Sequence, residues 1–511
     1  MMCKSTEQKI TAGLLAGSVF FLLLVIITNL FHYNYHMNAD IASETILGEV
    51  IWKSGQIIPD TWYPSTEVRV ISIPNLSAIF YGFTGNMVLA SGLACCMMTI
   101  LIFVSILCLI KSVGMKKADG LLMGALCLII PSGFIMLELI YLFAGYYAIH
   151  TVIFFVTLAM YASLLKRRNI VYKFIGGILL AFLLGLQGVR GILVIYGPLL
   201  CIELIRNTYF IYQKHKRDAF DLYLSLWVLF LLVASCLGNL LPFSVGQGFS
   251  RNIRKGFQKL FAVVIPDMVR AIGFESANLP GKICLGVLLL LTFYVLGHIL
   301  HLIWKREEIE PACWVWLVMC VSPVLTALMV AFTTVESTER YYFILLFLLP
   351  FSAVLIWKKS RNGVKYMIGA VALILALSNL AQVYLPILRS NEPPITEEYQ
   401  VTEFLEKEGL RTAYATFEHA NTMTVLSGGT VRVYPVATVE KMDICKWLAS
   451  ADWYCPNMPF EEKTAYIITD AEMDSFTIFL NGKDGHVNEA GKIGKYTIYV
   501  SDYNYSNLGT D

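Results

Sequence analysis

The sequence predicts a polytopic α-helical membrane protein with a small C-terminal α/β domain. Three observations lead to this fold class. Of the 511 residues, 57% are hydrophobic and only 15% are charged, which is too apolar for an ordinary soluble protein. Apolar windows long enough to cross a bilayer recur as far as residue 386. From about residue 388 the composition changes to that of a soluble domain.

About eleven apolar windows of roughly twenty residues predict a transmembrane domain over residues 1–387. The first window has no Ala-x-Ala signal before the polar segment that follows it, so we expect a retained span and not a cleaved signal peptide. The windows are 10–32, 85–110, 119–143, 148–165, 170–187, 191–205, 219–241, 283–304, 312–333, 341–357 and 364–386.

Lysine and arginine predict the orientation of these spans. One set of alternating loops, including that with Lys111, Lys116 and Lys117, carries about twice as many basic residues as the other set. The positive-inside rule then places the N-terminus in the cytoplasm. With an odd number of spans, the first long loop (33–84), the second (242–282) and the C-terminal segment all lie outside. We expect this membrane to be the bacterial plasma membrane.

The C-terminal segment, 388–511, predicts an extracytoplasmic α/β domain. A helix is expected over 397–408, with strands at 412–417, 430–436, 465–469 and 496–500. The chain has no Gly-rich phosphate loop and no dinucleotide fingerprint, so cytosolic ATP is not the expected energy source.

The first long loop contains the candidate catalytic acids. Asn38 or Asp40 is a good N-cap and Gly55 a good stop signal, which predicts a short amphipathic helix over 41–53 that lies along the membrane surface. Asp40 and Glu44 are four residues apart and therefore share a face. A carboxylate near apolar surface has a raised pKa and can act as a general base. The alternative is that both acids are solvated loop residues.

Two span ends on the same side offer candidate cations. Arg190 lies in the turn Gln187–Gly191, and Arg340 with Tyr341 opens a later span. An arginine at that depth needs a carboxylate, a carbonyl or a phosphate, and a helix start favours phosphate. The simpler alternatives are snorkelling and interfacial anchoring. Glu138, within an apolar window, also needs a partner.

The second long loop adds a basic amphipathic stretch with Arg251, Arg254 and Lys255. Guanidinium groups match phosphate geometry, so this stretch suits an anionic lipid head group. Ordinary adhesion to the membrane surface is the alternative explanation.

Cofactors and nucleic acid are not expected. The cysteine and histidine spacings do not support a metal site, and the basic residues lie in short loops between apolar windows. Cys445 and Cys455, both in the polar C-terminal segment, would pair if that segment faces an oxidising compartment.

In these features the chain resembles the GT-C superfamily of membrane glycosyltransferases, which includes protein O-mannosyltransferases and the aminoarabinose transferases of lipid A. These enzymes take a sugar from a polyprenyl-phosphate carrier. The resemblance also covers the general plan of the chain, with its outer C-terminal domain. The residues that carry it are Asn38–Asp40, Glu44, Gly48, Gly55, Tyr63–Pro64, Gly188–Arg190 and Arg340–Tyr341.

The resemblance implies an inverting transfer with Asp40 as the catalytic base. The second acid that usually stands beside the base is absent, and Glu44 is the nearest one. Arg340, Arg190 and the stretch 251–255 are the candidate partners of the lipid phosphate. The implied partners are a polyprenyl-phosphate-linked sugar, membrane lipid, and a glycan, lipid or protein acceptor.

Two other functions remain open at this stage. A polysaccharide polymerase or ligase would use arginines of a long outer loop, such as Arg251 and Arg254, in place of a first-loop acid. A lipid or solute transporter would show acids near mid-membrane and an internal repeat, and Glu138 is the clearest central acid.

Overall fold

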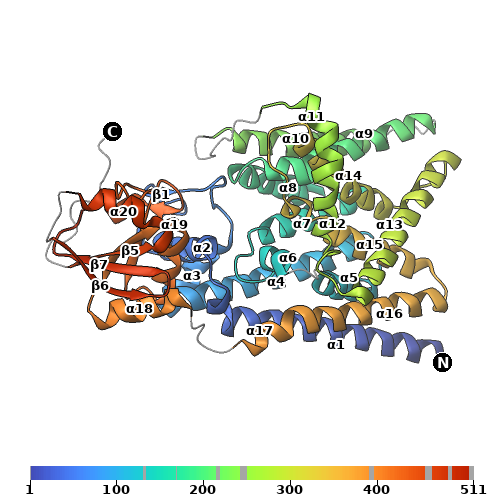
Figure 1. Cartoon of the computed structure of the whole chain (residues 1–511). Coiled ribbons are helices and arrows are strands. Elements are labelled where there is room, and N and C mark those ends of the chain that lie inside the picture. Colours follow the sequence, from blue (N-terminus) through green and yellow to red (C-terminus); the bar gives the residue numbers. More distant parts are fainter. Residues whose placement is uncertain are drawn as a thin grey trace. The chain divides into compact units, whose positions relative to one another are not determined.

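The computed structural model is mainly helical, with its main sheet in the C-terminal region (Figure 1). It describes residues 2–130, 134–167, 170–213, 219–241, 250–390, 396–454, 463–481 and 486–505.

The chain forms two compact units. The helical unit comprises Met1–Ile27 and Cys96–Leu388, and the mixed unit comprises Thr28–Cys95 and Arg389–Asp511. The C-terminal boundary falls at residue 388, where the composition changes. The first long loop, which the sequence-based division assigns to the transmembrane domain, is grouped with the C-terminal segment instead.

Within the described ranges, nine helices are long and apolar enough to cross a membrane. The remaining two predicted windows form shorter helices: α5 (Lys117–Ile129) with α6 (Phe134–Ile140), and α8 (Ile170–Leu186). The nine spans are Thr11–Phe31 of α1, Met87–Ser112 (α4), Ala148–Leu165 (α7), Ile192–Tyr212 (η2 and α9), Phe220–Asn239 of α10, Leu279–Lys305 (α13), Pro311–Ala331 (α14), Glu339–Lys359 (η4 and α15) and Asn362–Arg389 (α16, η5 and α17).

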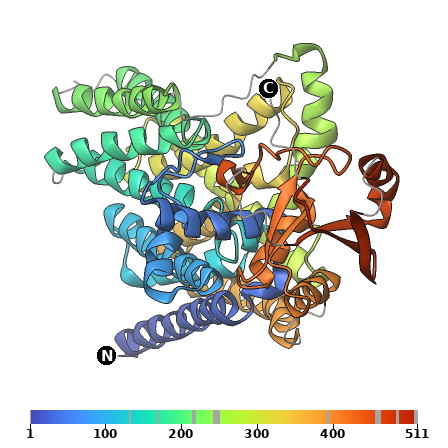
Figure 2. The same cartoon turned by 90° about the vertical axis from the view of Figure 1, so that its left-hand side faces the viewer.

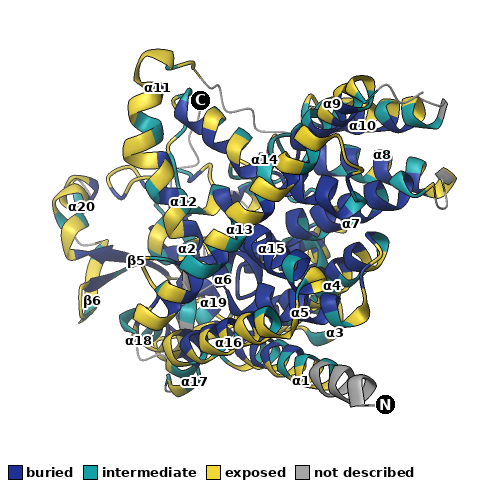
Figure 3. Cartoon of the chain, turned by 90° about the vertical axis from the view of Figure 1, so that its right-hand side faces the viewer, coloured by how far each residue is buried: buried dark blue, intermediate teal, exposed yellow. Residues whose placement is uncertain are grey.

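The burial of these helices separates a packed centre from an apolar outer surface. The span that contains α15 is 83% buried, whereas that of α13 is only 28% buried (Figure 3). Exposed positions of α13 include Leu290 and Phe293. Helices that remain apolar on their exposed side are suited to lipid, so the chain is a multi-pass membrane protein and the predicted fold class is confirmed.

The mixed unit contains a five-stranded sheet in the order β3-β2-β5-β7-β6 (Figure 2). β2 is parallel to β3 and β5, and β7 is antiparallel to β5 and β6. Four of these strands match the predicted ones, and β6 was not predicted. The strands are β2 (Thr412–Thr416), β3 (Arg432–Val436), β5 (Thr464–Thr469), β6 (Val487–Ile493) and β7 (Tyr496–Ser501).

Helices from both ends of the chain complete this unit. Tyr414 and Tyr466 belong to the hydrophobic cluster on one face of the sheet, and Ala413 and Ala465 to the cluster on the other, as the alternation along a strand requires. The helices are α2 (Ala39–Ser54), α3 (Ile73–Thr84), α18 (Glu397–Lys407), α19 (Phe417–Leu426) and α20 (Met473–Leu480), and β1 (Trp62–Tyr63) pairs with β4 (Ala449–Ser450).

Helix α2 starts two residues before the predicted range 41–53 and ends one residue after it, between the predicted cap Asn38 and the predicted stop Gly55. The Asn38 side chain caps it by accepting a hydrogen bond of 2.9 Å from the Ile41 amide. Gly55 ends it in the left-handed region, with a φ of 69° and an amide that donates to the Ile51 carbonyl.

The apolar stripe of α2 packs on protein, and most of the helix is buried. Leu47 packs with Trp62 in one hydrophobic cluster, and Ile46 packs with Val425 of α19 in another. Ser43 accepts a hydrogen bond of 2.8 Å from Asn421, also on α19. The helix therefore has partners on both faces and is a structural element of the mixed unit.

A buried ion pair joins α2 to the sheet. Arg432 of β3 donates to both carboxylate oxygens of Glu49, at 2.7 and 2.8 Å, and Lys53 and Tyr81 contact the same carboxylate. Glu49 is 3% exposed. Burial acts to raise the pKa of Glu49, but Arg432 and Lys53 lower it overall, from 4.5 to about 2.

Replacement of Glu49 by Gln should destabilise the mixed unit by about 2 kcal/mol, because Arg432 loses its charged partner in a largely buried position. Since the folded pKa lies below the ordinary one, the contribution of Glu49 is complete above pH 4.5 and is lost as the pH falls toward 2. Thermal unfolding of the purified protein at several pH values measures both effects. Asp470→Asn, which removes an exposed pair with Lys492, is the control and should have little effect.

Candidate functional site

Asp40 is in the first turn of α2, where its side chain is exposed. The first turn of a helix stabilises a carboxylate through the unpaired backbone amides and the helix dipole. Asp40 is therefore accessible from solution, as a residue that takes a proton from a substrate has to be.

Glu44 is one turn further along α2 in a different environment. It is buried, and Arg69 donates to it from Nε and Nη2, both at 2.8 Å. Arg69 also pairs with Glu67 at 3.1 Å. Burial raises the pKa of Glu44. The positive charge of Arg69 acts in the opposite direction, and the negative charge of Asp40 adds to the increase. The two acids that the sequence pairs on one face thus differ: Asp40 is open to solution and Glu44 is held in a buried ion pair.

Sequence reasoning missed the partners of these acids. Arg69 is 25 residues from Glu44 and Arg432 is 383 residues from Glu49. The carboxylates at 44 and 49 are themselves visible in the sequence, flanked by apolar residues, and that pattern indicates acids that need buried partners.

In the helical unit, Arg190 lies between α8 and η2 and stacks on an aromatic ring. Its guanidinium carbon is 4.1 Å from the centre of the Tyr147 ring. Tyr147 in turn contacts Phe343, with ring centres 5.0 Å apart. Phe343 directly follows the 3-10 helix η4 (Glu339–Tyr342), which contains Arg340. Through Tyr147, Arg190 is therefore in contact with the residue that directly follows η4.

Arg340 is exposed, and its guanidinium carbon is 5.8 Å from the ring centre of the half-buried Tyr341. The next residue, Tyr342, is buried in a hydrophobic cluster with Val264 and Ala271. This cluster joins η4 to the long helix within the second loop, which spans residues 253–271.

The basic stretch of the second loop starts a continuous helix, α11 (Ile253–Lys259), η3 (Leu260–Val264) and α12 (Ile265–Ala271). Arg251, Arg254 and Lys255 are all exposed, although the backbone of Arg251 pairs with Thr333 at the end of α14. Residues 242–249 of this loop lie outside the described ranges.

The same helix has an exposed apolar stripe. Ile253, Phe257, Phe261 and Ile265 are exposed at intervals of four residues, and the helix runs across the direction of α1 and α16 (Figure 1). A basic helix with such a stripe is typical of a membrane interface.

Lys259 has a different role from the other basic residues of this stretch. Its ammonium group donates to the carbonyls of Val330 at 2.7 Å, Thr333 at 3.0 Å and Val335. These carbonyls belong to the last turn of α14 and to the residues directly after it, so Lys259 caps the end of that helix.

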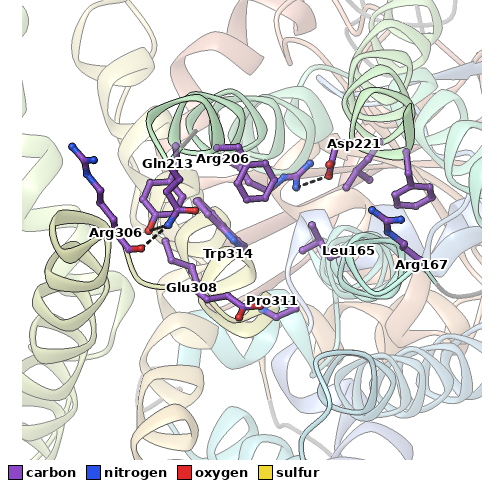
Figure 4. Close-up of a pocket in the computed structure, with 14 residues that line it drawn as sticks. Leu165, Arg167, Arg206, Gln213, Asp221, Arg306, Glu308, Pro311 and Trp314 are labelled. Atoms are coloured by element: carbon purple, nitrogen blue, oxygen red, sulfur yellow. Dashed lines mark hydrogen bonds and ion pairs between the residues drawn. The ribbon is translucent and has the colours of Figure 1, made fainter. Parts of the chain in front are cut away.

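The opposite end of the helical unit contains a pocket of about 460 Å³ (Figure 4). Arg206 on its wall is bonded to Glu203 at 2.7 Å and to Asp221 at 3.2 Å, which ties α9 to α10. The Arg306 side chain points away from the pocket and stacks on Tyr212, 4.0 Å from the ring centre. Because its buried charges are paired, we assign this pocket to helix packing.

Among the other predicted residues, Glu138 is half-buried on α6 and Cys445 is buried, with its Sγ 3.6 Å from the Trp447 carbonyl oxygen. Cys455 lies outside the described ranges, so its pairing with Cys445 stays a prediction. In the described part of the chain, no group of three or more His, Cys, Asp or Glu side chains is placed to hold a metal ion.

No protein-family model and no curated protein matches the sequence. Solved structures do match. ArnT from Cupriavidus metallidurans in the apo state aligns over 98% of this chain and 99% of its own, with a TM-score of 0.59 and 10% identity. This chain has the fold of ArnT. The ArnT structure bound to undecaprenyl phosphate aligns over the same shares, with a TM-score of 0.54 and 11% identity.

The predicted resemblance to GT-C membrane glycosyltransferases is therefore confirmed for the fold. A weaker match is the oligosaccharyltransferase AglB from Archaeoglobus fulgidus in complex with an inhibitory peptide and a dolichol-phosphate. It has a TM-score of 0.46 and 12% identity, and the alignment covers 82% of this chain but only 64% of AglB.

The Glu44–Arg69 pair allows a test of the structural role of Glu44. Arg69→Met should destabilise the protein by about 3 kcal/mol, because it leaves a buried carboxylate without its main partner. Glu44→Gln combined with Arg69→Met should recover part of that loss, since the charge is then removed as well. Thermal unfolding of the two single variants and the double variant measures the coupling. Strictly additive effects would contradict the assigned pair.

Proposed function

We propose that this protein is an inverting glycosyltransferase that moves a sugar from a polyprenyl-phosphate carrier to an acceptor on the outer face of the bacterial plasma membrane. The observation that carries this proposal is the likeness to the ArnT fold over almost the full length of both chains. The acid that follows the first span and the arginines at one end of the helical unit supply the chemistry that such a reaction needs.

Asp40 is proposed as the base. The carboxylate takes the proton of an acceptor hydroxyl, and the oxygen lone pair then forms a bond to the anomeric carbon. The bond from that carbon to the carrier phosphate breaks, and its electron pair stays on the phosphate oxygen. Attack on the face opposite the leaving group inverts the anomeric centre, through an oxocarbenium-like transition state. Glu44 is proposed as the second acid of the site. It is ion-paired with Arg69 and lies one helical turn after Asp40.

The departing lipid phosphate gains negative charge, which cations must stabilise. Arg340 is exposed in the short helix η4 at the start of a span, and Arg190 packs on Tyr147, whose ring contacts Phe343 directly after η4. Guanidinium groups bind phosphate oxygens in pairs, so arginine fits this task better than lysine. Tyr341, Arg251, Arg254 and Lys255 are proposed to hold the phosphate and the surrounding lipid head groups.

Asp40→Asn should lower the transfer rate by about 100-fold or more, because a general base is lost while shape is conserved. The readout is mass spectrometry of cell-envelope glycans from a deletion strain that carries either the wild-type chain or the variant. Asp60→Asn, in the same loop, is the matched control and should restore the glycan fully. A fully active Asp40→Asn protein would remove the proposed base.

The polymerase or ligase alternative predicts another pattern in the same assay. There Arg251→Ala abolishes transfer and Asp40→Asn does not. The proposed mechanism instead predicts a partial effect of Arg251→Ala.

Arg340→Ala should weaken binding of undecaprenyl phosphate by about tenfold, since a charge-assisted hydrogen bond to phosphate is lost. Native mass spectrometry of the detergent-solubilised protein with added undecaprenyl phosphate measures this affinity. Arg167→Ala removes an exposed arginine at the other end of α8 from Arg190 and serves as the control. Equal losses in both variants would show that the contact is non-specific.

A further inference from the structure

The mixed unit contains a polar pocket that the proposed reaction does not use. Its volume is about 270 Å³, near the lower end for small-molecule sites. The segment that leads into α2 forms one wall, and α18 and α19 form the others. Most of its lining is polar, including Asn34, Asn38, Glu398, Glu418, His419 and Thr422.

A hydrogen-bonded chain fixes the histidine of this pocket. The Tyr496 hydroxyl donates its proton to Glu398 and lies 2.9 Å from Nδ1 of His419. Because the hydroxyl proton of Tyr496 is donated to Glu398, the hydrogen bond between Tyr496 and His419 is donated by Nδ1–H of the histidine. Nε2 of the neutral ring then carries a lone pair and can accept a hydrogen bond. Burial, and then the charge of Lys495, lower the pKa of His419, which favours the neutral ring.

A second observation points to a ligand in the pocket. Thr422 of α19 lines it and is only 7% exposed. Its hydroxyl is buried without a hydrogen-bond partner in the described part of the chain. A buried hydroxyl left without a partner costs about 1–3 kcal/mol, so a group inside the pocket that bonds to it would recover this energy.

The lining determines which ligand fits. The carboxylates of Glu398 and Glu418 and Nε2 of His419 all accept hydrogen bonds, so the ligand must present several donors. Glu398 is within 3.5 Å of Lys495, and Glu418 is exposed, so the pocket has no buried unpaired charge that would require a cation. Met37 and Leu426 add apolar surface. Several hydroxyls on a partly apolar ring are the features of a sugar.

We propose that this pocket binds one sugar residue of a glycan, with Thr422 and His419 as hydrogen-bonding partners of its hydroxyls. Two of its lining residues, Asn38 and Ala39, directly precede Asp40 in the chain. The pocket is therefore suited to hold a sugar of the acceptor beside the reacting hydroxyl. The assignment of the bound sugar to the acceptor rests on the proposed function, whereas the binding of a sugar in this pocket does not.

The test uses the full chain in nanodiscs and the methyl glycosides of glucose, galactose, mannose and N-acetylglucosamine as probes. Saturation-transfer NMR should detect binding of at least one of them. Thr422→Val keeps the shape of the side chain and removes the unpartnered hydroxyl, so the variant should fold with an unchanged or higher unfolding temperature. We expect its affinity for the glycoside to fall by about fivefold.

Thr477→Val, a helical threonine on α20 that does not line the pocket, is the matched control and should bind as the wild type does. His419→Gln retains a polar side chain and should also weaken binding. Absence of binding by every glycoside, or unchanged affinity in both pocket variants, would overturn the proposal. Preferential binding of ethanolamine would overturn it as well, because the pocket would then be a site for amines.

Glycoside binding and transfer are separate readouts. The Asp40→Asn protein should bind the glycoside as the wild type does, even where transfer is lost. Loss of transfer with intact binding would support the pocket and the base together. Binding without any transferase activity in the wild type would refute the proposed function and leave the sugar site in place.

Discussion

The bidentate ion pair between Glu49 and Arg432 is the interaction on which the mixed unit depends. It joins a helix near the start of the chain to a strand 383 residues later. The hydrogen bond from Asn421 to Ser43 and the pairing of β1 with β4 act at the same junction. Because α2 is fixed in this way, the first turn that contains Asp40 belongs to a rigid element and not to a flexible loop. A proposed base gains from such an anchor, since catalysis requires a defined position of the reacting group.

Much of this fold can be predicted from local sequence signals. The cap at Asn38, the stop at Gly55 and four of the five strands of the main sheet depend on residues within a few positions of each other. Strand β6 was not predicted because Val487–Ile493 lacks a run of β-branched or aromatic residues and contains a register shift between Glu489 and Gly491. The apolar window predicted at 119–143 forms the two helices α5 and α6 in place of one span. Helix α5 ends at Ile129, just before Pro131 in the sequence.

The long-range features could not be predicted in the same way. An apolar stripe on α2 indicates that a face is buried, but it does not say whether lipid, α3 or α19 covers that face. The carboxylates of Glu44 and Glu49 indicate that protein covers this face. Two acids among apolar residues fit a protein interior with arginine partners better than a lipid surface. Their partners come from distant segments, so only the folded chain identifies them. In the helical unit, the contacts of Tyr147 with Arg190 and with Phe343 are equally non-local.

The grouping of the first long loop with the C-terminal segment affects how the protein is made. Helix α2 is synthesised between two membrane-spanning helices, and α19 and Arg432 follow only after several further spans. Until Arg432 has been added, 383 residues after Glu49, this carboxylate and the apolar faces of α2 lack their native partners.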